Sequence, residues 1–158
     1  MHRVFCATPW EMEAERICFY DVVGQFNEAS AMAKGVLYVP VSLVNVRDKR
    51  PMQYVIEENI RDASHFILLL SENWGPTERN FENDYLLARE CAADPALPMR
   101  EIALLRRMER SGRPLADGIP QPDAAFSTMD EFRECIRNLL GLWFANLTAS
   151  GDADKKTA

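Results

Sequence analysis

The chain has 158 residues, 47% hydrophobic and 27% charged, which fits one globular domain with a sizeable core and leaves little room for two. With 24 acidic and 18 basic residues its net charge is −6, so the average surface repels phosphate backbones and nucleic acid is not an expected partner. The basic residues between Arg106 and Arg113 are interrupted by Glu109, include no aromatic side chain, and are interpreted as a solvated face.

Cysteine and histidine are too dispersed to predict a metal site. The four cysteines form no C-x-x-C pair, and only two histidines occur. We interpret the cysteines as core residues in a reducing compartment. Because the sequence also shows no signal-peptide pattern and no apolar run long enough to cross a bilayer, we expect a cytoplasmic protein without membrane contact.

The first residues predict a strand followed by a helix. Residues 4–7 form a short apolar run, as expected of a strand buried on both faces of a parallel sheet. Thr8-Pro9-Trp10-Glu11 has the form of a capping box in which Thr8 is the N-cap. Apolar residues at helical spacing extend this helix to about Ala33, and Gly35 ends it.

Two further strands are predicted around a second helix. β-branched residues favour a strand over residues 36–44, where Pro40 indicates an edge position or a kink. After a polar loop at 45–50, Pro51 opens the helix. Residues 65–70 are the strongest strand pattern in the chain, and we expect them at the centre of the sheet.

The next segment predicts a helix and two more strands. Thr77 is a good N-cap for a helix that ends at Asp94. Residues 99–108 fit either a strand or a short helix, and a strand at 101–105 is favoured. A last short strand is predicted at 124–126.

A second capping box at Thr128 opens the last predicted helix, which extends to Leu147. Its broad apolar face is expected to pack on the sheet, and a partner surface is the less favoured alternative. The alternation of strands and helices predicts a flavodoxin-like three-layer α/β/α sandwich with a mostly parallel five-stranded sheet. We expect residues 1–147 to form this single domain and residues 148–158, which are small and polar, to be a disordered tail.

Ligands bind such sheets at the carboxyl ends of the strands, so the loops at 8–11, 43–53 and 71–82 are the expected site. Several chemistries are excluded by missing motifs: a phosphate-binding P-loop, a dinucleotide-binding glycine fingerprint and a G-x-S-x-G nucleophile elbow. Leu70-Ser71 also ends the central strand where a phosphoacceptor aspartate would be needed. Glu82 remains, in the first turn of a helix that follows that strand. An ionised carboxylate there could stabilise a cationic sugar-like transition state, or it could only complement the helix dipole.

The chain resembles the TIR-like domains of bacterial defence and signalling proteins, whose relatives include the nucleoside deoxyribosyltransferases. The resemblance covers roughly residues 3–147 and lies in the order of the elements and in four segments: R-V-F-C-A-T-P-W-E-M-E-A-E-R from residue 3, P-M-Q-Y-V-I-E-E-N-I-R-D-A from 51, F-I-L-L-L-S-E-N-W-G from 66 and F-E-N-D-Y-L-L-A from 81.

This resemblance implies an N-glycosidic bond as target, because enzymatic TIR domains cleave NAD at its nicotinamide bond. It assigns the catalytic role to Glu82, with NAD or a related nucleotide as substrate and no cofactor or metal. Thr8 and the amides around Trp10 would contact phosphate or ribose, and Gln53 would hydrogen-bond at the pocket wall. The loop after the central strand would add Asn73, Trp74 and Gly75, with Trp74 stacking on a base.

The alternative is a non-catalytic TIR-like module that binds a nucleotide-like small molecule or a protein partner, or assembles with its own copies. A third hypothesis is nucleobase exchange. The deoxyribosyltransferases carry a glycine and a small residue before the Phe-Glu pair, whereas Glu78-Arg79-Asn80 brings charge near the expected pocket here. The bland alternatives for the binding residues are a helix cap at Thr8, a core cover at Trp10, a solvated residue at Gln53 and a loop anchor at Trp74.

Overall fold

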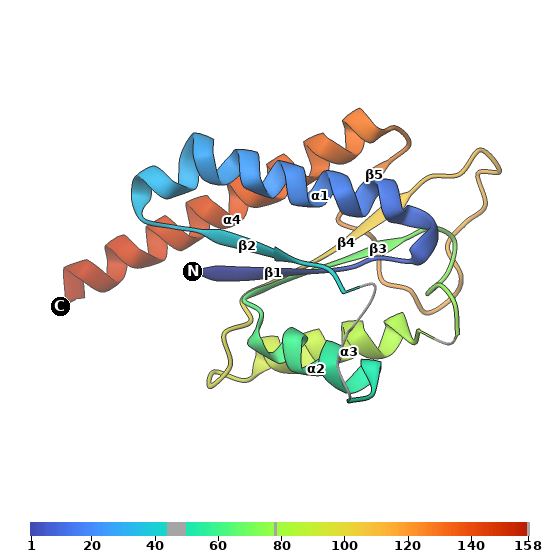
Figure 1. The fold of residues 1–158 in the computed structure, drawn as a ribbon, viewed down its shortest axis with the longest axis horizontal. Coiled ribbons are helices and arrows are strands. Elements are labelled where there is room, and N and C mark those ends of the chain that lie inside the picture. Colours follow the sequence, from blue (N-terminus) through green and yellow to red (C-terminus); the bar gives the residue numbers. More distant parts are fainter. Residues whose placement is uncertain (44–49, 78, 158) are drawn as a thin grey trace.

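A parallel five-stranded sheet forms the centre of the molecule (Figure 1). The computed structural model describes residues 1–43, 50–77 and 79–157, and their side chains up to residue 150. The strands are β1 (His2–Ala7), β2 (Tyr38–Val41), β3 (His65–Leu70), β4 (Glu101–Arg107) and β5 (Ala124–Phe126). Their order is β2-β1-β3-β4-β5 and every neighbouring pair is parallel. The predicted sandwich is therefore confirmed, with β3 central and β2, which contains Pro40, at an edge.

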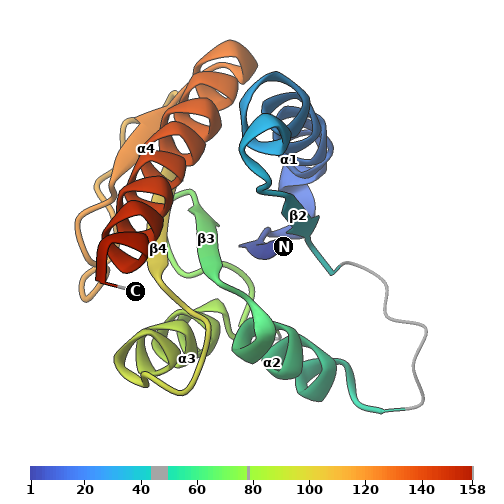
Figure 2. The same cartoon turned by 90° about the vertical axis from the view of Figure 1, so that its left-hand side faces the viewer.

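Four helices cover the two faces of the sheet. They are α1 (Glu13–Phe26), α2 (Met52–Asp62), α3 (Phe81–Ala93) and α4 (Met129–Thr157), with a short turn η1 (Trp10–Met12) before α1 and two more, η2 (Asn27–Ala31) and η3 (Met32–Lys34), after it. Helices α1 and α4 lie on one face and α2 and α3 on the other (Figure 2). None of the described helices is long and apolar enough to span a membrane.

Alternating strand residues divide the core into two clusters. Ile67 and Leu69 of β3 pack towards α1 and α4, and Phe66, Leu68 and Leu70 pack towards α2 and α3. All six residues of β3 are buried, because helices cover both faces of the sheet. This double burial explains why the strand is a continuous apolar run rather than an alternating one.

Two predicted helix caps are wrong. Thr8 does not cap a helix: its hydroxyl donates to the carbonyl of Cys6 at 3.4 Å, and no side chain caps η1. Thr77 does not cap α3 either, because the chain first makes a turn in which the amide of Arg79 donates to Pro76. Asn80, at a left-handed φ of 50°, is the N-cap, and its side-chain oxygen accepts from the amide of Asn83.

The C-terminal third differs from expectation at its end. The ambiguous segment around residue 101 is the strand β4, as favoured, and Thr128 caps α4 by accepting from the amide of Glu131. Helix α4 then continues to Thr157, past the predicted start of a disordered tail. Residues 148–157 contain no proline and one glycine, Gly151, whose cost of about 1 kcal/mol in a helix does not by itself end it. The polar loop predicted at 45–50 lies mostly outside the described residues, as does Glu78.

Candidate functional site

A pocket opens where β1 and β3 end, at the point where the strand order reverses. Its volume is about 340 Å³. The described residues that line it come from the loops after β1, β2 and β3 and from the first turns of α2 and α3: Thr8, Trp10, Leu43, Met52, Pro76, Arg79 and Phe81. The sequence predicted this edge, and the structure brings these three loops together there.

The side chains after β1 give the pocket an aromatic and a hydroxyl group. Trp10 is 76% exposed, so it does not cover the core and its ring is open to a ligand. The Thr8 hydroxyl lies 3.4 Å from the Cys6 sulfur and 3.5 Å from the Ser42 hydroxyl, which orients it at the pocket wall. Burial raises the pKa of the Cys6 thiol to about 12, so this cysteine stays protonated and is not a nucleophile.

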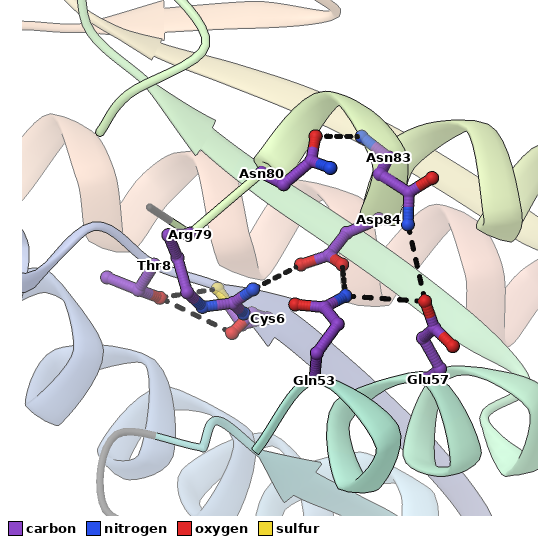
Figure 3. Close-up of polar contacts among 8 residues, drawn as sticks. All are labelled: Cys6, Thr8, Gln53, Glu57, Arg79, Asn80, Asn83 and Asp84. Atoms are coloured by element: carbon purple, nitrogen blue, oxygen red, sulfur yellow. Dashed lines mark hydrogen bonds and ion pairs between the residues drawn. The ribbon is translucent and has the colours of Figure 1, made fainter. Parts of the chain in front are cut away.

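Behind the pocket lies a fully buried carboxylate, Asp84, whose side chain is 0% exposed (Figure 3). Arg79 Nη1 donates to one of its oxygens at 2.8 Å, and Gln53 Nε2 donates to the other at 3.1 Å. Burial raises the pKa of Asp84, while Arg79 and Gln53 favour its charged form. An unpaired buried charge would be costly, so these two contacts are what make an aspartate acceptable at this position.

The contacts of Asp84 continue from α3 to α2. Gln53 also lies 3.5 Å from Glu57 Oε1, and the Asn83 amide donates to the same oxygen at 3.3 Å (Figure 3). The network therefore ties the first turns of two helices together beside the pocket, and Arg79 is its one member that also lines the pocket.

Not all of the predicted binding residues reach the pocket. Thr8 and Trp10 line it, whereas Gln53 lies behind it in the Asp84 network. In the loop after β3, the Asn73 side chain accepts from the amide of Gly75 at 2.8 Å. Trp74 packs on Tyr85 with ring centroids 5.7 Å apart, which matches its interpretation as a loop anchor.

Gly75 supports the pocket wall from behind. Its φ is +90°, and a Cβ at this position would lie 2.9 Å from the ring of Phe81, which lines the pocket. Glycine is therefore needed here both for the backbone conformation and for the close approach of Phe81.

Glu82, the predicted catalytic residue, is exposed on α3 and is not among the described residues that line the pocket. The inward face of α3 carries Phe81, Asp84, Tyr85 and Ala88, and Glu82 lies off this face. Sequence reasoning missed Asp84, although a signal for it exists. It occupies the i+3 position of the apolar stripe that begins at Phe81, where an acid is unusual.

In the arginine segment 106–113, Arg107 and Arg113 lie near acids, whereas Arg106 Nε donates to the carbonyl of Ser71 at 3.1 Å. Arg107 contacts Glu15 at 3.2 Å and Glu109 at 3.0 Å, and Arg113 lies 3.8 Å from Glu72.

Within the described part of the chain, no three His, Cys, Asp or Glu side chains gather to hold a metal ion. Comparisons with models of known protein families and with curated proteins find no match to this chain.

Proposed function

We propose that this chain is a TIR-like domain that binds a nucleotide-like small molecule in the pocket between the ends of β1 and β3. The observation that carries the proposal is the meeting of the exposed Trp10 ring, the Thr8 hydroxyl and the Arg79 guanidinium around one cavity of about 340 Å³. Small-molecule sites have this character, with mostly apolar walls and a few fixed polar groups.

Each group suits a different part of a nucleotide. The Trp10 ring can stack on a base, because every base offers a flat π face. Leu43 and Met52 supply apolar wall beside it. Thr8 can donate to or accept from a sugar hydroxyl. Arg79 supplies the positive charge that an anionic ligand needs.

The same geometry favours binding over hydrolysis. Cleavage of an N-glycosidic bond with a carboxylate requires that group close to the anomeric carbon. Among the described residues that line the pocket there is no acid, Asp84 is fully buried and ion-paired, and Glu82 is exposed. NAD hydrolysis is the second candidate function, because Glu82 directly follows the pocket residue Phe81 and a change in side-chain conformation would be needed to bring it in.

The binding proposal is tested by titrating the purified chain with NAD and with ADP-ribose in a calorimeter. We expect saturable binding, and we expect Trp10→Ala to weaken it by about 5- to 150-fold, since stacking on an aromatic ring contributes about 1–3 kcal/mol per base. Tyr54→Ala is the matched control, because Tyr54 is an exposed aromatic residue outside the pocket lining. Absence of saturable binding would reject the proposal.

Hydrolysis is tested separately by chromatography of NAD incubated with concentrated protein. The binding module predicts that NAD is recovered intact with wild-type protein. Release of nicotinamide that Glu82→Gln abolishes, in a variant that keeps the wild-type melting temperature, would establish the hydrolase instead.

A further inference from the structure

Arg79 is a pocket residue whose guanidinium is held by two neighbours. Asp84 holds the Nη1 end of its guanidinium at 2.8 Å, and the Phe81 ring lies beneath it with 4.5 Å between the guanidinium carbon and the ring centroid. Its side chain is 19% exposed. The charge is therefore held at the boundary between the protein interior and the cavity.

We propose that Arg79 binds the phosphate group of a nucleoside phosphate, and that Asp84 and Gln53 are positioning residues that orient Arg79 towards it. This inference rests on the proposed nucleotide-binding function, which it deepens by naming the ligand class and the group that recognises it.

The guanidinium of Arg79 has N–H donors that its contact with Asp84 does not use. A guanidinium offers five N–H donors in one plane and fits phosphate oxygens in pairs. Among the described residues, the hydrogen bond to Asp84 is the only one that the Arg79 side chain makes. Since Arg79 also lines the cavity, its remaining donors can serve an oxygen of a bound ligand.

The restricted motion of the guanidinium lowers the entropy that Arg79 would lose on binding a ligand. An arginine in solvent loses rotamer entropy when it binds a ligand, whereas a side chain that is already held loses less. The Phe81 ring on one side and the hydrogen bond to Asp84 both restrict the motion of the guanidinium. Gln53, which reaches Asp84 from α2, fixes the carboxylate in turn (Figure 3).

The position of the pair distinguishes it from an ordinary surface ion pair. Asp84 is fully buried, and burial of a charged group has a large desolvation cost. A role in ligand binding would account for that cost, because Arg79, the partner of Asp84, lines the neighbouring cavity. The surrounding walls exclude part of the solvent, which strengthens a charge-assisted hydrogen bond to phosphate.

The test compares nucleotides with their nucleosides. Calorimetric titrations use AMP and GMP as phosphate-bearing probes and adenosine and guanosine as the same bases without phosphate. Wild-type protein should bind each monophosphate more tightly than its nucleoside. Arg79→Gln should weaken monophosphate binding by about 10- to 100-fold, the usual range for a hydrogen bond to a charged group, and leave nucleoside binding within about 3-fold.

Three further variants separate positioning from simple structural support. Asp84→Asn keeps the size and shape of the side chain but removes the charge that orients Arg79, so it should reduce the preference for monophosphate over nucleoside. Arg79→Lys keeps the charge without the planar fork and should restore only part of the preference. Arg89→Gln is the matched control, because Arg89 also lies over an aromatic ring of α3, that of Tyr85, but is outside the pocket lining, and it should change neither affinity. Each variant is accepted for titration if its circular dichroism spectrum matches that of wild type, and Gln53→Ala replaces Asp84→Asn if that variant does not fold.

The outcomes distinguish failure of this inference from failure of the proposed function. If wild-type protein binds none of the four probes, nucleotide binding itself is rejected, together with the inference. If it binds monophosphates and nucleosides equally well, or if Arg79→Gln weakens both equally, the pocket still binds nucleosides but Arg79 is not the phosphate-binding residue.

Discussion

The two edges of the sheet differ in how they hold charge. At the carboxyl edge, Arg79 and Asp84 lie 2.8 Å apart, with 19% and 0% of their side chains exposed. At the amino edge, Arg3 and Asp62 lie 3.7 Å apart, with 42% and 59% exposed. The cavity at the amino edge is larger, about 530 Å³, and its lining is more polar: Met1, His2, Arg3, Asp62, Ser64, Pro98 and Arg100.

This difference shows that cavity size alone is a poor guide to a binding site. An exposed ion pair in water contributes little, so the Arg3–Asp62 pair of the amino-edge cavity is weakly held. The carboxyl-edge cavity is smaller, but a buried carboxylate fixes the arginine that lines it. At the carboxyl edge, burial of Asp84 has a desolvation cost, and the buried carboxylate holds the guanidinium of Arg79 in place.

The sharpest test of this contrast is to remove the acid at each edge. Asp84→Ala leaves Arg79 mostly buried and without its partner, and we expect the free energy of unfolding to fall by about 3 kcal/mol. Asp62→Ala removes the corresponding acid from the exposed pair and should cost less than about 1 kcal/mol. Urea unfolding of both variants measures the two values.

Equal losses of unfolding free energy for these two variants would show that the buried Arg79–Asp84 pair contributes no more to stability than the exposed Arg3–Asp62 pair. The double variant Arg79→Met with Asp84→Leu provides a further check. If the cost of Asp84→Ala comes mainly from the stranded charge of Arg79, replacing both partners with apolar residues should recover most of the lost stability.

The amino edge has its own buried titratable group, His65. It is 1% exposed, lies 2.8 Å from the Ser64 hydroxyl and packs on the Trp143 ring with centroids 4.8 Å apart. Burial, together with the smaller effects of the charges of His2 and Arg100, lowers the pKa of His65 to about 3. His65 is therefore neutral in the folded protein across the physiological range.

We expect acidification to destabilise the protein through this histidine. In the unfolded chain the pKa of His65 is 6.5, so below that pH the unfolded state takes up a proton that the folded state refuses. Stability from His65 is complete above pH 6.5 and is lost as the pH falls towards 3. Between pH 7 and pH 5 the loss should be about 2 kcal/mol.

Urea unfolding at pH 7, 6 and 5 measures this loss, with His65→Phe as the variant that cannot titrate. The pKa of His2 is also lowered, so it adds to the effect with the same sign. The raised pKa of Asp84 acts in the opposite direction, because the folded state then retains a proton more readily than the unfolded state. A wild-type stability that does not depend on pH more strongly than that of His65→Phe would contradict the prediction.

The sheet could be predicted from sequence because its signals are local. The apolar run of β3 indicates a strand that is buried on both faces. The proline in β2 indicates an edge strand, because a proline nitrogen has no hydrogen to donate to a neighbouring strand. Helix starts were harder, since Thr77 and Asn80 are both good caps. The turn closed by the Pro76 carbonyl and the Arg79 amide selects the later residue, and sequence spacing does not reveal that turn.

The location of the pocket could be predicted, but the contacts around it could not. The rule that ligands bind at the carboxyl edge pointed to the loop that holds Thr8 and Trp10, and both line the pocket there. Asp84 pairs with Arg79, which comes just before α3, and with Gln53, which comes from another helix. The contact with Gln53 is tertiary, so a search for acids in the first turn does not reveal the buried network of Asp84.

The smallest expected effect concerns the glycine that supports Phe81, and it tests whether the wall of the carboxyl-edge pocket is as tightly held as the charge beside it. Gly75 and Gly118 have nearly the same backbone conformation, with φ of +90° and +86°. A Cβ at Gly75 would lie 2.9 Å from the Phe81 ring, whereas a Cβ at Gly118 would have no described atom within 4 Å. Replacement by alanine should therefore lower the free energy of unfolding by about 1 kcal/mol at Gly118, from the backbone alone, and by about 2 kcal/mol at Gly75, as measured by thermal unfolding.

The same two variants also test the binding site. Because the guanidinium of Arg79 lies over the Phe81 ring, Gly75→Ala should weaken AMP binding while Gly118→Ala leaves it unchanged. If the two alanine variants are equally stable, the Phe81 ring can shift to accommodate the added methyl group, and the pocket wall is less rigidly held than the Arg79–Asp84 pair.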